Sequence, residues 1–469
     1  MALSRRAMIL GGCAAAAVVP VALHLNWGAK DFVRAGFTPD VPPAPPKRVN
    51  WANWSGIQRA TPTAVAVAKD EAALKQIFAE GTAPFRPVGS GHSFCALVPT
   101  DGTIIDISPM AGVISQDEAA GTLTFGAGTR LQHAARLMAE RGLAFSNLSD
   151  IDTQTLAGMF ATATHGTGQS LTAIHDHITG FRIMLSSGEV RDVSATSDPD
   201  LFAAGKVSLG ALGVITQYTV KPVPAFNLKR KLWSEPIATL LPKIETLAKN
   251  NRNFEFFYLP STGMAAALTH NVHAGPITGR QESGDDEVIT GLKQLRDEFG
   301  WWPWLRSYIA NREMPQGVIE DSSDESWKLL ATGRPLKFNE MEYELPIEGG
   351  KRALLEVIAA ADAQKNLFYP TETRFIAGDD AWLSPFNSGP RLSISVHTSA
   401  EEDVDFLYSV FEPIFRKHGG RPHWGKLHSL KREDFRKLYP KFDDFAALRK
   451  TLDPQGKMLN PFLSELFGT

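Results

Sequence analysis

Residues 64–91 have the sequence AVAVAKDEAALKQIFAEGTAPFRPVGSG, and this pattern predicts a strand, a helix and a second strand. Alternating Ala and Val favour the first strand, Asp70 and Glu71 are typical of a helix start, and apolar residues then recur at helical spacing. A βαβ unit is therefore expected. It ends in Gly-Ser-Gly, whose glycines allow positive φ and expose amide N–H groups in a concave nest suited to a phosphate or pyrophosphate. His92 follows this nest directly, and the nest alone does not explain it.

The composition is that of a folded, nearly neutral protein. A chain of 469 residues is too long for one ordinary core, so two domains, or one domain with a large inserted layer, are expected. Lys and Arg number 48 against 51 Asp and Glu, which gives no electrostatic reason to expect nucleic acid and favours a small, weakly charged substrate. Only Cys13 and Cys95 occur, which excludes a disulfide framework and cysteine-based zinc or iron–sulfur sites.

The N-terminal segment, residues 1–37, joins the pair Arg5 and Arg6 to an Ala-rich apolar stretch. This pattern is typical of a twin-arginine export signal and predicts a periplasmic or other extracytoplasmic protein. A transmembrane anchor is the alternative, although Gly, Pro and His residues dilute the apolarity, and membrane association is expected through this segment only. Leu10–Cys13 also resembles a lipobox, in which Cys13 would carry a lipid.

Changes in composition divide the rest of the chain. Pro-rich residues 38–50 predict a linker, and residues 51–222 form a first region with an α/β pattern and mixed strand directions. Residues 223–422, the second region, have longer alternating runs and helices and predict an α+β domain. Residues 423–469 form a C-terminal segment whose apolar tail is expected to dock on a core.

Several local patterns are specific enough to test. Residues 129–142 predict an amphipathic helix capped by Thr129 and closed by Gly142. Residues 178–194 predict a hairpin across Ser-Ser-Gly. Residues 279–287 and 312–325 are expected to be polar loops.

The glycine-rich loops do not match the Rossmann fingerprint. Phe94 occupies the position of the third glycine after the first nest, and GAGTRL at residues 126–131 fails in the same way. A dinucleotide held in the usual nicotinamide manner is therefore not expected. AGMFATATHGTG, residues 157–168, is by itself compatible with a tight buried turn. Its combination with the first nest and with SLGALGVIT, residues 208–216, favours a site for an extended ligand.

Six motifs together resemble a known family. They are RPVGSGHSF (86–94), NLSDIDTQTLAGMFATATHGTG (147–168), SLGALGVIT (208–216), TETR (371–374) followed by WLSP (382–385), RPHWGK (421–426) and LDPQGKMLNPF (452–462). Their order resembles that of the vanillyl-alcohol-oxidase/PCMH-type flavoproteins, and within them the branch of sugar-lactone and alditol oxidases. The resemblance extends from Trp51 to Phe467. It implies an α+β protein with a two-domain PCMH-type FAD-binding fold, made of two α/β subdomains and an α+β substrate (cap) domain over the flavin.

The resemblance implies that FAD is bound covalently through His92. In that branch the histidine of the Gly-x-Gly-His-Ser loop is bonded through its ring to the methyl carbon of the flavin benzene ring, and such a substituent is expected to raise the flavin potential. The alternative is a histidine that hydrogen-bonds a buried loop. Cys95 is interpreted as a buried packing residue. The other residues expected at the cofactor are Val88, Gly89, Ser90, Gly91, Ser93, Asp150, Gly158, Thr162, Thr164, His165, Gly166, Gly213, Ile215, His423 and Lys426.

The resemblance also implies the catalytic groups. It places a Glu-x-Arg pair and the lysine of His-Trp-x-Lys at the substrate face of the flavin, which are Glu372, Arg374 and Lys426 here. Residues two apart on a strand point to one face, so a carboxylate can accept a hydrogen bond from a sugar hydroxyl while the guanidinium stabilises a developing alkoxide. An exposed cross-strand pair is the alternative. Lys426 would stabilise the anionic reduced cofactor, and His397 lies near a position where relatives place an active-site histidine.

Two departures from the branch bear on the reaction. Asp150 stands where alditol oxidases carry a substrate-contacting serine, which favours a lactone or an unfamiliar polyol. Ser149 stands where glycine favours oxidases and alanine is typical of a dehydrogenase, and its bulk favours an acceptor other than oxygen.

The expected function is that of an exported, covalently flavinylated oxidoreductase. It would oxidise a CH–OH group of an aldono-1,4-lactone or sugar alcohol and pass electrons to O2 or a respiratory acceptor. The alternatives are a flavin dehydrogenase of another alcohol or of a 2-hydroxy acid, and a non-catalytic exported flavin-binding protein.

Overall fold

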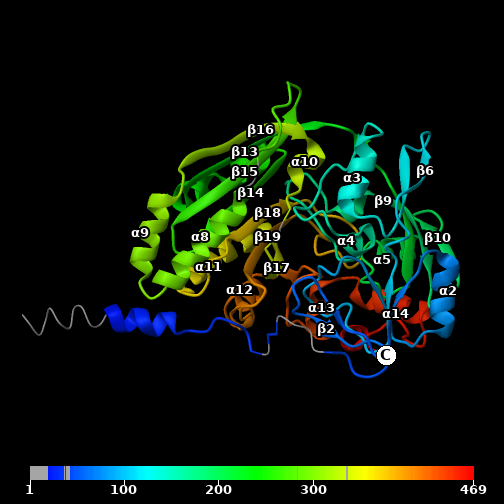
Figure 1. Cartoon of the computed structure of the whole chain (residues 1–469). Coiled ribbons are helices and arrows are strands. Elements are labelled where there is room, and N and C mark those ends of the chain that lie inside the picture. The colour runs from blue at the N-terminus through cyan, green and yellow to red at the C-terminus, as the bar shows by residue number, and fades with distance from the viewer. Residues whose placement is uncertain (1–19, 36, 39–42, 282–283, 334–335, 469) are drawn as a thin grey trace, which may run out of the picture.

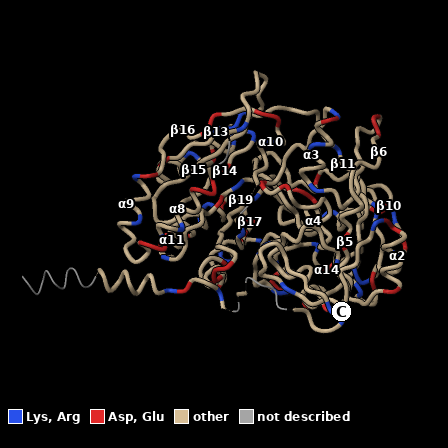
Figure 2. The backbone as a smooth tube through the Cα atoms, viewed as in Figure 1, with Lys and Arg blue, Asp and Glu red and all other residues tan. Residues whose placement is uncertain are grey.

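The structure is a computed structural model, and the residues it describes are 20–35, 37–38, 43–281, 284–333 and 336–468. The residues on which the export and lipid predictions depend, Arg5, Arg6 and Cys13, lie outside them. In the described ranges no helix has the length and apolarity that crossing a bilayer requires. Lys, Arg, Asp and Glu are interspersed along both regions (Figure 2), as the near-neutral charge of the chain leads one to expect.

The first region begins with the predicted βαβ unit (Figure 1). Asp70 starts the helix α2 (Glu71–Glu80) because its side chain accepts a hydrogen bond from the Ala73 N–H. The unit is confirmed, with a third strand between its two strands. The order of this parallel sheet is β3 (Ala64–Val67), β5 (Thr103–Asp106), β4 (Phe85–Val88).

A second, antiparallel sheet completes the first region. The hairpin predicted over residues 178–194 is confirmed, and so are the mixed strand directions. The strand order is β10 (Val190–Ser194), β9 (Ile178–Met184), β11 (Val214–Val220), β7 (Thr122–Gly126), β6 (Val113–Asp117). The other elements are β1 (Trp51–Ala52), β2 (Arg59–Ala60), α3 (Leu131–Ala139), β8 (Leu143–Ala144), α4 (Leu156–Ala161), a 3₁₀ turn (Ile174–His177) and α5 (Pro199–Gly205).

The predicted cap of α3 is wrong. The helix begins at Leu131, and its N-cap residue Arg130 makes no side-chain cap. Thr129 is buried and its hydroxyl donates to the Gly126 carbonyl, so it cannot serve the helix N-terminus. Gly142, with φ of +68°, ends the segment as expected.

The second region is built on one eight-stranded antiparallel sheet (Figure 1). Its order is β16 (Gly317–Glu325), β13 (Asn227–Pro236), β15 (Met264–His273), β14 (Asn253–Leu259), β18 (Thr371–Ile376), β19 (Arg391–Ser399), β17 (Phe338–Pro346), β20 (Arg421–Pro422). The other elements of this region are β12 (Val223–Pro224), α6 (Ile237–Leu240), a 3₁₀ turn (Leu241–Lys243), α7 (Ile244–Asn250), α8 (Asp285–Phe299), α9 (Pro303–Glu313), α10 (Ser326–Leu330), α11 (Ile347–Ala363), a π-helical turn (Leu407–Phe411) and α12 (Glu412–Lys417).

The two polar loops expected in this region are in part regular structure. Residues 285–287 form the acidic first turn of α8, where negative side chains favour the helix N-terminus. Residues 317–325 form β16, which pairs with β13 only. Because β16 is an edge strand with an exposed first half, its sequence lacks the apolar alternation of a central strand.

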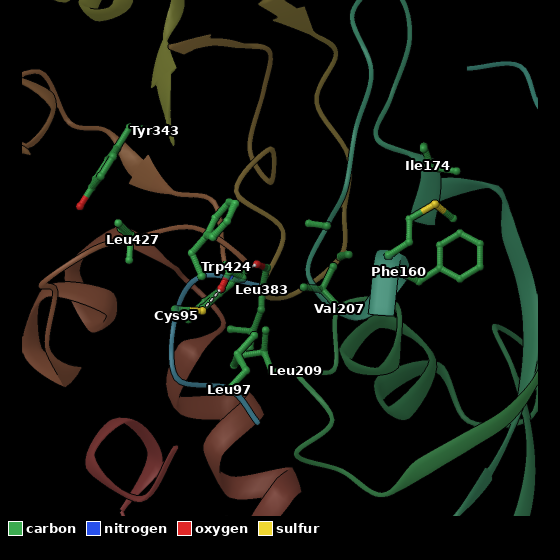
Figure 3. Close-up of a cluster of buried hydrophobic side chains, with 14 of the residues drawn as sticks. Cys95, Leu97, Phe160, Ile174, Val207, Leu209, Tyr343, Leu383, Trp424 and Leu427 are labelled. Carbon is green, nitrogen blue, oxygen red and sulfur yellow. Dashed lines mark hydrogen bonds between the residues drawn. The ribbon is translucent and has the colours of Figure 1, made fainter. Parts of the chain in front are cut away.

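The C-terminal segment packs against the first region through α13 (Arg432–Leu438), α14 (Phe442–Leu452) and α15 (Pro461–Phe467). Arg86 joins the two parts, because its buried guanidinium donates to the carbonyls of Leu209 and Met458. Figure 3 shows Cys95 beside Trp424, and the Cys95 thiol donates to the Trp424 carbonyl at 2.6 Å. Cys95 is therefore a buried packing residue, as predicted.

Candidate active site

A cavity of about 890 Å³ lies between the glycine-rich loops of the first region and one face of the eight-stranded sheet. All the predicted site residues except Gly166 line it: Val88, Gly89, Ser90, Gly91, His92, Ser93, Asp150, Gly158, Thr162, Thr164, His165, Gly213, Ile215, Glu372, Arg374, His397, His423 and Lys426. Gly166 directly follows His165, which lines the cavity. A Cβ at Gly166 would collide with the Leu148 carbonyl and the Asn147 side chain, so this glycine allows loop packing behind the cavity wall.

The nest loop is held against the start of α4. Gly91 has φ of +71°, which a glycine adopts without strain. A Cβ at Gly89 would collide with the hydroxyl of Thr155, the residue that caps α4. The Ser90 hydroxyl donates to the Thr153 carbonyl at 2.6 Å, which fixes the loop on the segment that enters α4. The loop therefore keeps its concave form and places His92 at the cavity wall.

One ring nitrogen of His92 is engaged and the other is not. Nε2 lies 2.9 Å from the Thr153 hydroxyl, whereas Nδ1 is buried and has no hydrogen-bond partner among the described residues. The ring also packs against Trp54, with 4.9 Å between ring centroids. Burial, helped by the positive charges of Lys426 and Arg130, lowers the pKa of His92 to about 4. At neutral pH the imidazole is uncharged, and a proton on Nε2 that bonds to Thr153 leaves a lone pair on Nδ1.

The register of the large sheet brings distant residues into two rows. Ala266, Phe257, Glu372, Ser395 and Glu342 stand directly opposite one another on five successive strands. Residues directly opposite in antiparallel strands point to the same face, so this row forms one stripe on the cavity wall.

The parallel row lies two residues along each strand. It contains Leu268, Glu255, Arg374, Ser393 and Glu344 in the same strand order. Both rows share one face because the side-chain period of a strand is two.

Glu372 and Arg374 share a face, as their spacing predicted, and both are buried, with exposed fractions of 6% and 9%. The alternative of an exposed pair is thus excluded. Arg374 Nη2 lies 2.5 Å from Glu372 Oε1, and Arg374 Nε lies 3.0 Å from Glu255 Oε2. Burial raises the pKa of Glu372 to about 7, with Arg374 opposing the rise. Glu372 can therefore exchange a proton near neutral pH while the guanidinium stays charged.

Lys426 meets acidic residues of β17 across the cavity. Its ammonium contacts the Glu340 carboxylate and lies 3.6 Å from Glu342 Oε2. Burial acts against the charge, but the two glutamates outweigh it and the pKa of Lys426 lies above its ordinary value. His397 Nε2 lies 3.4 Å from Glu340 Oε1 and its Nδ1 lies 3.1 Å from the Pro370 carbonyl. Glu340 therefore links Lys426 to His397.

His165 is held as an imidazolium. Its Nδ1 lies 2.9 Å from the Gly166 carbonyl, and its Nε2 lies 3.2 Å and 3.3 Å from Glu342 and Glu344. Acceptors stand at both nitrogens, so both carry protons. Burial opposes this charge, but the glutamates outweigh it and raise the pKa of His165 to about 10.

His423 is the uncharged neighbour of His165. Burial lowers the pKa of His423 to about 3, and its Nδ1 accepts a hydrogen bond from the Gly425 N–H at 3.0 Å. One neutral and one positively charged histidine thus stand side by side at the cavity, with ring centroids 5.6 Å apart.

The acidic partners of these cations were not among the predicted site residues. They are Glu255 on β14 and the alternating Glu340, Glu342 and Glu344 on β17. A signal was present in both strands, because single glutamates stand among aromatic residues in FEFFYL and glutamates alternate with apolar residues in EMEYEL. Charged residues in such strands indicate buried pairing.

Comparisons with known proteins agree with this geometry. Residues 218–466 match the family model for D-arabinono-1,4-lactone oxidase, and residues 62–194 match the model for an FAD binding domain. The chain belongs to the D-arabinono-1,4-lactone oxidase family. This finding confirms the predicted resemblance and establishes FAD as the cofactor and an FAD-dependent oxidoreductase as the class of enzyme.

Curated relatives in this family match almost end to end. The L-gulono-1,4-lactone dehydrogenase of Mycobacterium tuberculosis is 34% identical over 429 residues, covering 89% of this chain and 99% of the relative. The L-gulonolactone oxidase of Mus musculus is 30% identical, covering 89% and 97%. The alditol oxidase of a Streptomyces species is 28% identical, covering 80% and 89%.

A solved structure of cholesterol oxidase from B. sterolicum superimposes with a TM-score of 0.72 at 14% identity. The match covers 92% of this chain and 100% of that one. At this identity the likeness concerns the fold alone, and it confirms the predicted fold class.

FAD, the cofactor of this family, fits the residues that line the cavity. Gly91, with φ of +71°, and the neighbouring Gly89, Ser90 and Ser93 line the cavity, as does Gly213 on the opposite loop. His92 lines this space and its buried Nδ1 has no hydrogen-bond partner among the described residues, and Lys426 and His165 supply positive charge. The residues that would hold the cofactor are thus in place in the first region and the C-terminal segment.

Proposed function

We propose that the protein oxidises a CH–OH group of an aldono-1,4-lactone or a sugar alcohol by hydride transfer to FAD. The observation that carries this proposal is the buried Glu372–Arg374 pair, which lines the same cavity as the flavin-holding loops and Lys426. Membership of the D-arabinono-1,4-lactone oxidase family and the activities for which the relatives are named support it.

The residues divide the work of the oxidation. FAD supplies the hydride acceptor when bound. Glu372, whose pKa is about 7, takes the proton of the carbinol hydroxyl, and the Arg374 guanidinium stabilises the negative charge that develops on the oxygen. Lys426, kept charged by Glu340, stabilises negative charge at the reduced cofactor. The carbinol thus loses a hydride and a proton and becomes a carbonyl.

The charge of the site favours a neutral substrate over a 2-hydroxy acid. Carboxylates of Glu255, Glu340, Glu342 and Glu372 line or border the cavity, and their cationic partners are already paired. A substrate carboxylate would add a like charge to a buried, low-dielectric site, which is costly. Asp150, also on the cavity wall, favours a lactone over an alditol because alditol oxidases carry serine at this position.

The covalent link and the acceptor are part of the proposal. The unpartnered Nδ1 of His92 supports a bond from this atom to the flavin methyl carbon. One methyl C–H bond would break, the methyl hydrogen and the imidazole proton would pass with two electrons to the flavin ring, and the enzyme's electron acceptor would then reoxidise the flavin. Electrons then pass to O2 or to a respiratory acceptor. Ser149 is buried, and its hydroxyl donates a hydrogen bond to the Ile151 carbonyl at 2.8 Å, so its side chain has a fixed position. The bulk of this side chain favours a respiratory electron acceptor over O2.

Anaerobic flavin reduction tests the proposed function. We expect L-gulono-1,4-lactone or D-arabinono-1,4-lactone to bleach the flavin absorbance of the purified holoenzyme faster than alditols do, and 2-hydroxy acids to leave it unchanged. Bleaching by a 2-hydroxy acid but by no lactone or alditol would contradict the proposal. Bleaching by dithionite alone would favour the non-catalytic alternative.

We also propose that the protein is exported by the twin-arginine route. Its N-terminal segment would be the part of the chain that engages the membrane during transport. The pair Arg5 and Arg6 before a weakly apolar stretch supports this location. A protein that acquires its flavin must fold where FAD is abundant, and this pathway carries folded proteins.

Replacing Arg5 and Arg6 by lysine is expected to trap flavinylated, active enzyme in the cytoplasm with its N-terminal segment uncleaved. Cell fractionation with in-gel flavin fluorescence checks this result, and Cys13→Ala, with both arginines intact, is the control for lipid attachment. If the double variant reaches the extracytoplasmic fraction with flavin attached, the twin-arginine interpretation is wrong.

A further inference from the structure

The cavity continues beyond the charged residues into an apolar end. On the cavity face of the sheet, Phe257 stands directly opposite Glu372, and Ala266 stands opposite Phe257 on the next strand. In the parallel row Leu232 stands opposite Leu268, which stands opposite Glu255. All of these residues line the cavity. Phe257, Ala266, Leu232 and Leu268 therefore form an apolar strip that joins the catalytic pair, and Arg230, Ser234 and His270 on the same strands border this strip.

Helices α8 and α9 form the opposite wall of this apolar end. Gly291, Leu295 and Phe299 of α8 line it, and Ile309 of α9 lines it further along. These α8 positions are each four residues apart and so form one stripe on the helix, bordered by the polar side chains of Glu287, Gln294 and Glu298. Each position of the stripe is only partly buried, as expected for side chains that border open space rather than packed core.

The apolar end also reaches the molecular surface. Val288 and Ile319 belong to its wall and are 45% and 41% exposed. A ligand can therefore have one end at the catalytic pair and an apolar chain that extends toward solvent.

A sugar lactone or polyol uses none of this apolar surface, since its hydroxyls would lose hydrogen bonds to water there. The proposed reaction has a second substrate, however, because the reduced flavin must be reoxidised. An electron acceptor with a polar, redox-active ring and an apolar chain matches the cavity, which is polar at the catalytic pair and apolar farther along.

We propose that the apolar end binds the chain of a quinone and places its ring at the catalytic pair after the oxidised sugar has left. This inference rests on the proposed function, which generates the reduced flavin. The reduced flavin loses two electrons and two protons, and the quinone gains them to become a hydroquinone. No further oxidant or reductant is required.

The surface around this end indicates where such a quinone would come from. Trp302, Trp304 and Tyr308 are 42%, 66% and 51% exposed at the start of α9, and Trp and Tyr side chains favour the membrane interface. The helix of residues 20–28 lies beside them (Figure 1), because the Trp301 indole donates to His24 at 3.1 Å. These exposed aromatic residues make the membrane the expected source of the quinone.

Gly291→Phe tests the proposal by filling the apolar end. A Cβ at Gly291 meets no atom within 4 Å, and phenylalanine is a better helix former than glycine, so the variant should fold. The holoenzyme is photoreduced without oxygen and mixed with decylubiquinone or with the same quinone ring lacking the chain. We expect the chain to speed reoxidation at least about tenfold in the wild type and to confer no advantage in Gly291→Phe. Gly291→Ala, which adds only a methyl group, should keep the advantage.

A binding measurement complements the kinetics. Calorimetry on the oxidised holoenzyme should show decylubiquinone binding in the wild type and Gly291→Ala and a loss of at least about tenfold in affinity in Gly291→Phe. Ala266→Leu narrows the cavity from the sheet side and should weaken binding in the same way.

Three results would overturn the proposal. Reoxidation at the same rate with and without the chain would exclude a chain-binding site, and unaltered binding in both Gly291→Phe and Ala266→Leu would place the site elsewhere. Faster flavin reduction by a sugar alcohol bearing an alkyl chain, lost in Gly291→Phe, would assign the apolar end to the donor substrate. Photoreduction bypasses the sugar, so a failure of the proposed function would show only in the sugar experiment.

Discussion

Arg374→Ala and Lys426→Ala are each expected to lower kcat at least about 10²-fold while FAD remains bound, because each removes a positive charge aimed at negative charge that develops in the reaction. Both cations line the cavity and pair with carboxylates of the eight-stranded sheet. Single-turnover flavin reduction with the best sugar substrate measures the effect. Near-normal rates in both variants would remove these residues from the mechanism.

The pH dependence of kcat/KM separates the role of Arg374 at Glu372 from the role of Lys426 at the cofactor. Arg374 opposes the rise in the pKa of Glu372 that burial causes, so Arg374→Ala should raise this pKa above about 7. Glu372 acts as a base only when deprotonated, and activity is lost as pH falls through its pKa. The acid limb of kcat/KM should therefore move to higher pH in Arg374→Ala, stay nearly in place in Lys426→Ala, and return toward the wild type in Arg374→Lys.

A stability measurement distinguishes a loss of catalysis from a loss of folding in these variants. Removal of Arg374 leaves the buried carboxylate of Glu372 and the partly buried carboxylate of Glu255 without their cation, and breaking a buried pair typically costs about 3–5 kcal/mol in the free energy of unfolding. Lys417→Ala breaks an exposed ion pair with Glu356 and is the matched control, with an unfolding temperature and turnover expected to be close to those of the wild type. Thermal unfolding of the holoenzymes shows whether each variant is folded at the assay temperature.

Local chemistry explains which parts of the molecule were predictable. Asp70, the glycines around Ser90 and the Ser-Ser-Gly hairpin act within a few residues of the chain, so their sequence patterns predict their structures. The Glu372–Arg374 spacing likewise predicts a shared face. Thr129 shows the limit of such patterns, because a tertiary hydrogen bond to Gly126 takes the hydroxyl from the helix.

The acidic half of the site depends on pairing between distant strands. Glu255 meets Arg374 only because β14 pairs with β18, and Glu340 meets Lys426 only because residues near the C-terminus return to β17. No local pattern specifies those partners, although glutamates in apolar strands indicate that cations must exist for them. β16 was not predicted either, because an edge strand can have a polar sequence that lacks the apolar alternation of a central strand.

His92→Ala is expected to abolish the attachment of FAD to the polypeptide. In the wild type the cofactor should remain with the chain after acid or denaturant, because the uncharged imidazole, with its pKa near 4, has a free Nδ1 lone pair at the cavity wall. The measurement is flavin absorbance in the protein pellet and supernatant after acid precipitation. A yellow supernatant from the wild type would contradict the covalent bond.

Two further variants assign the bond to one atom and one residue. Thr153→Val removes the hydroxyl that engages Nε2, so the tautomer with a free Nδ1 is no longer favoured, and covalent incorporation should be slower but not abolished. His423→Ala removes another buried histidine of the same cavity and should leave attachment intact. An imidazolyl substituent withdraws electrons, so His92→Ala reconstituted with FAD should have a lower flavin reduction potential than the wild type. His423→Ala keeps the bond to His92 and should therefore keep the increase in potential that this substituent causes. Equal potentials in the wild type and His92→Ala would mean that the bond holds the cofactor in place without tuning it.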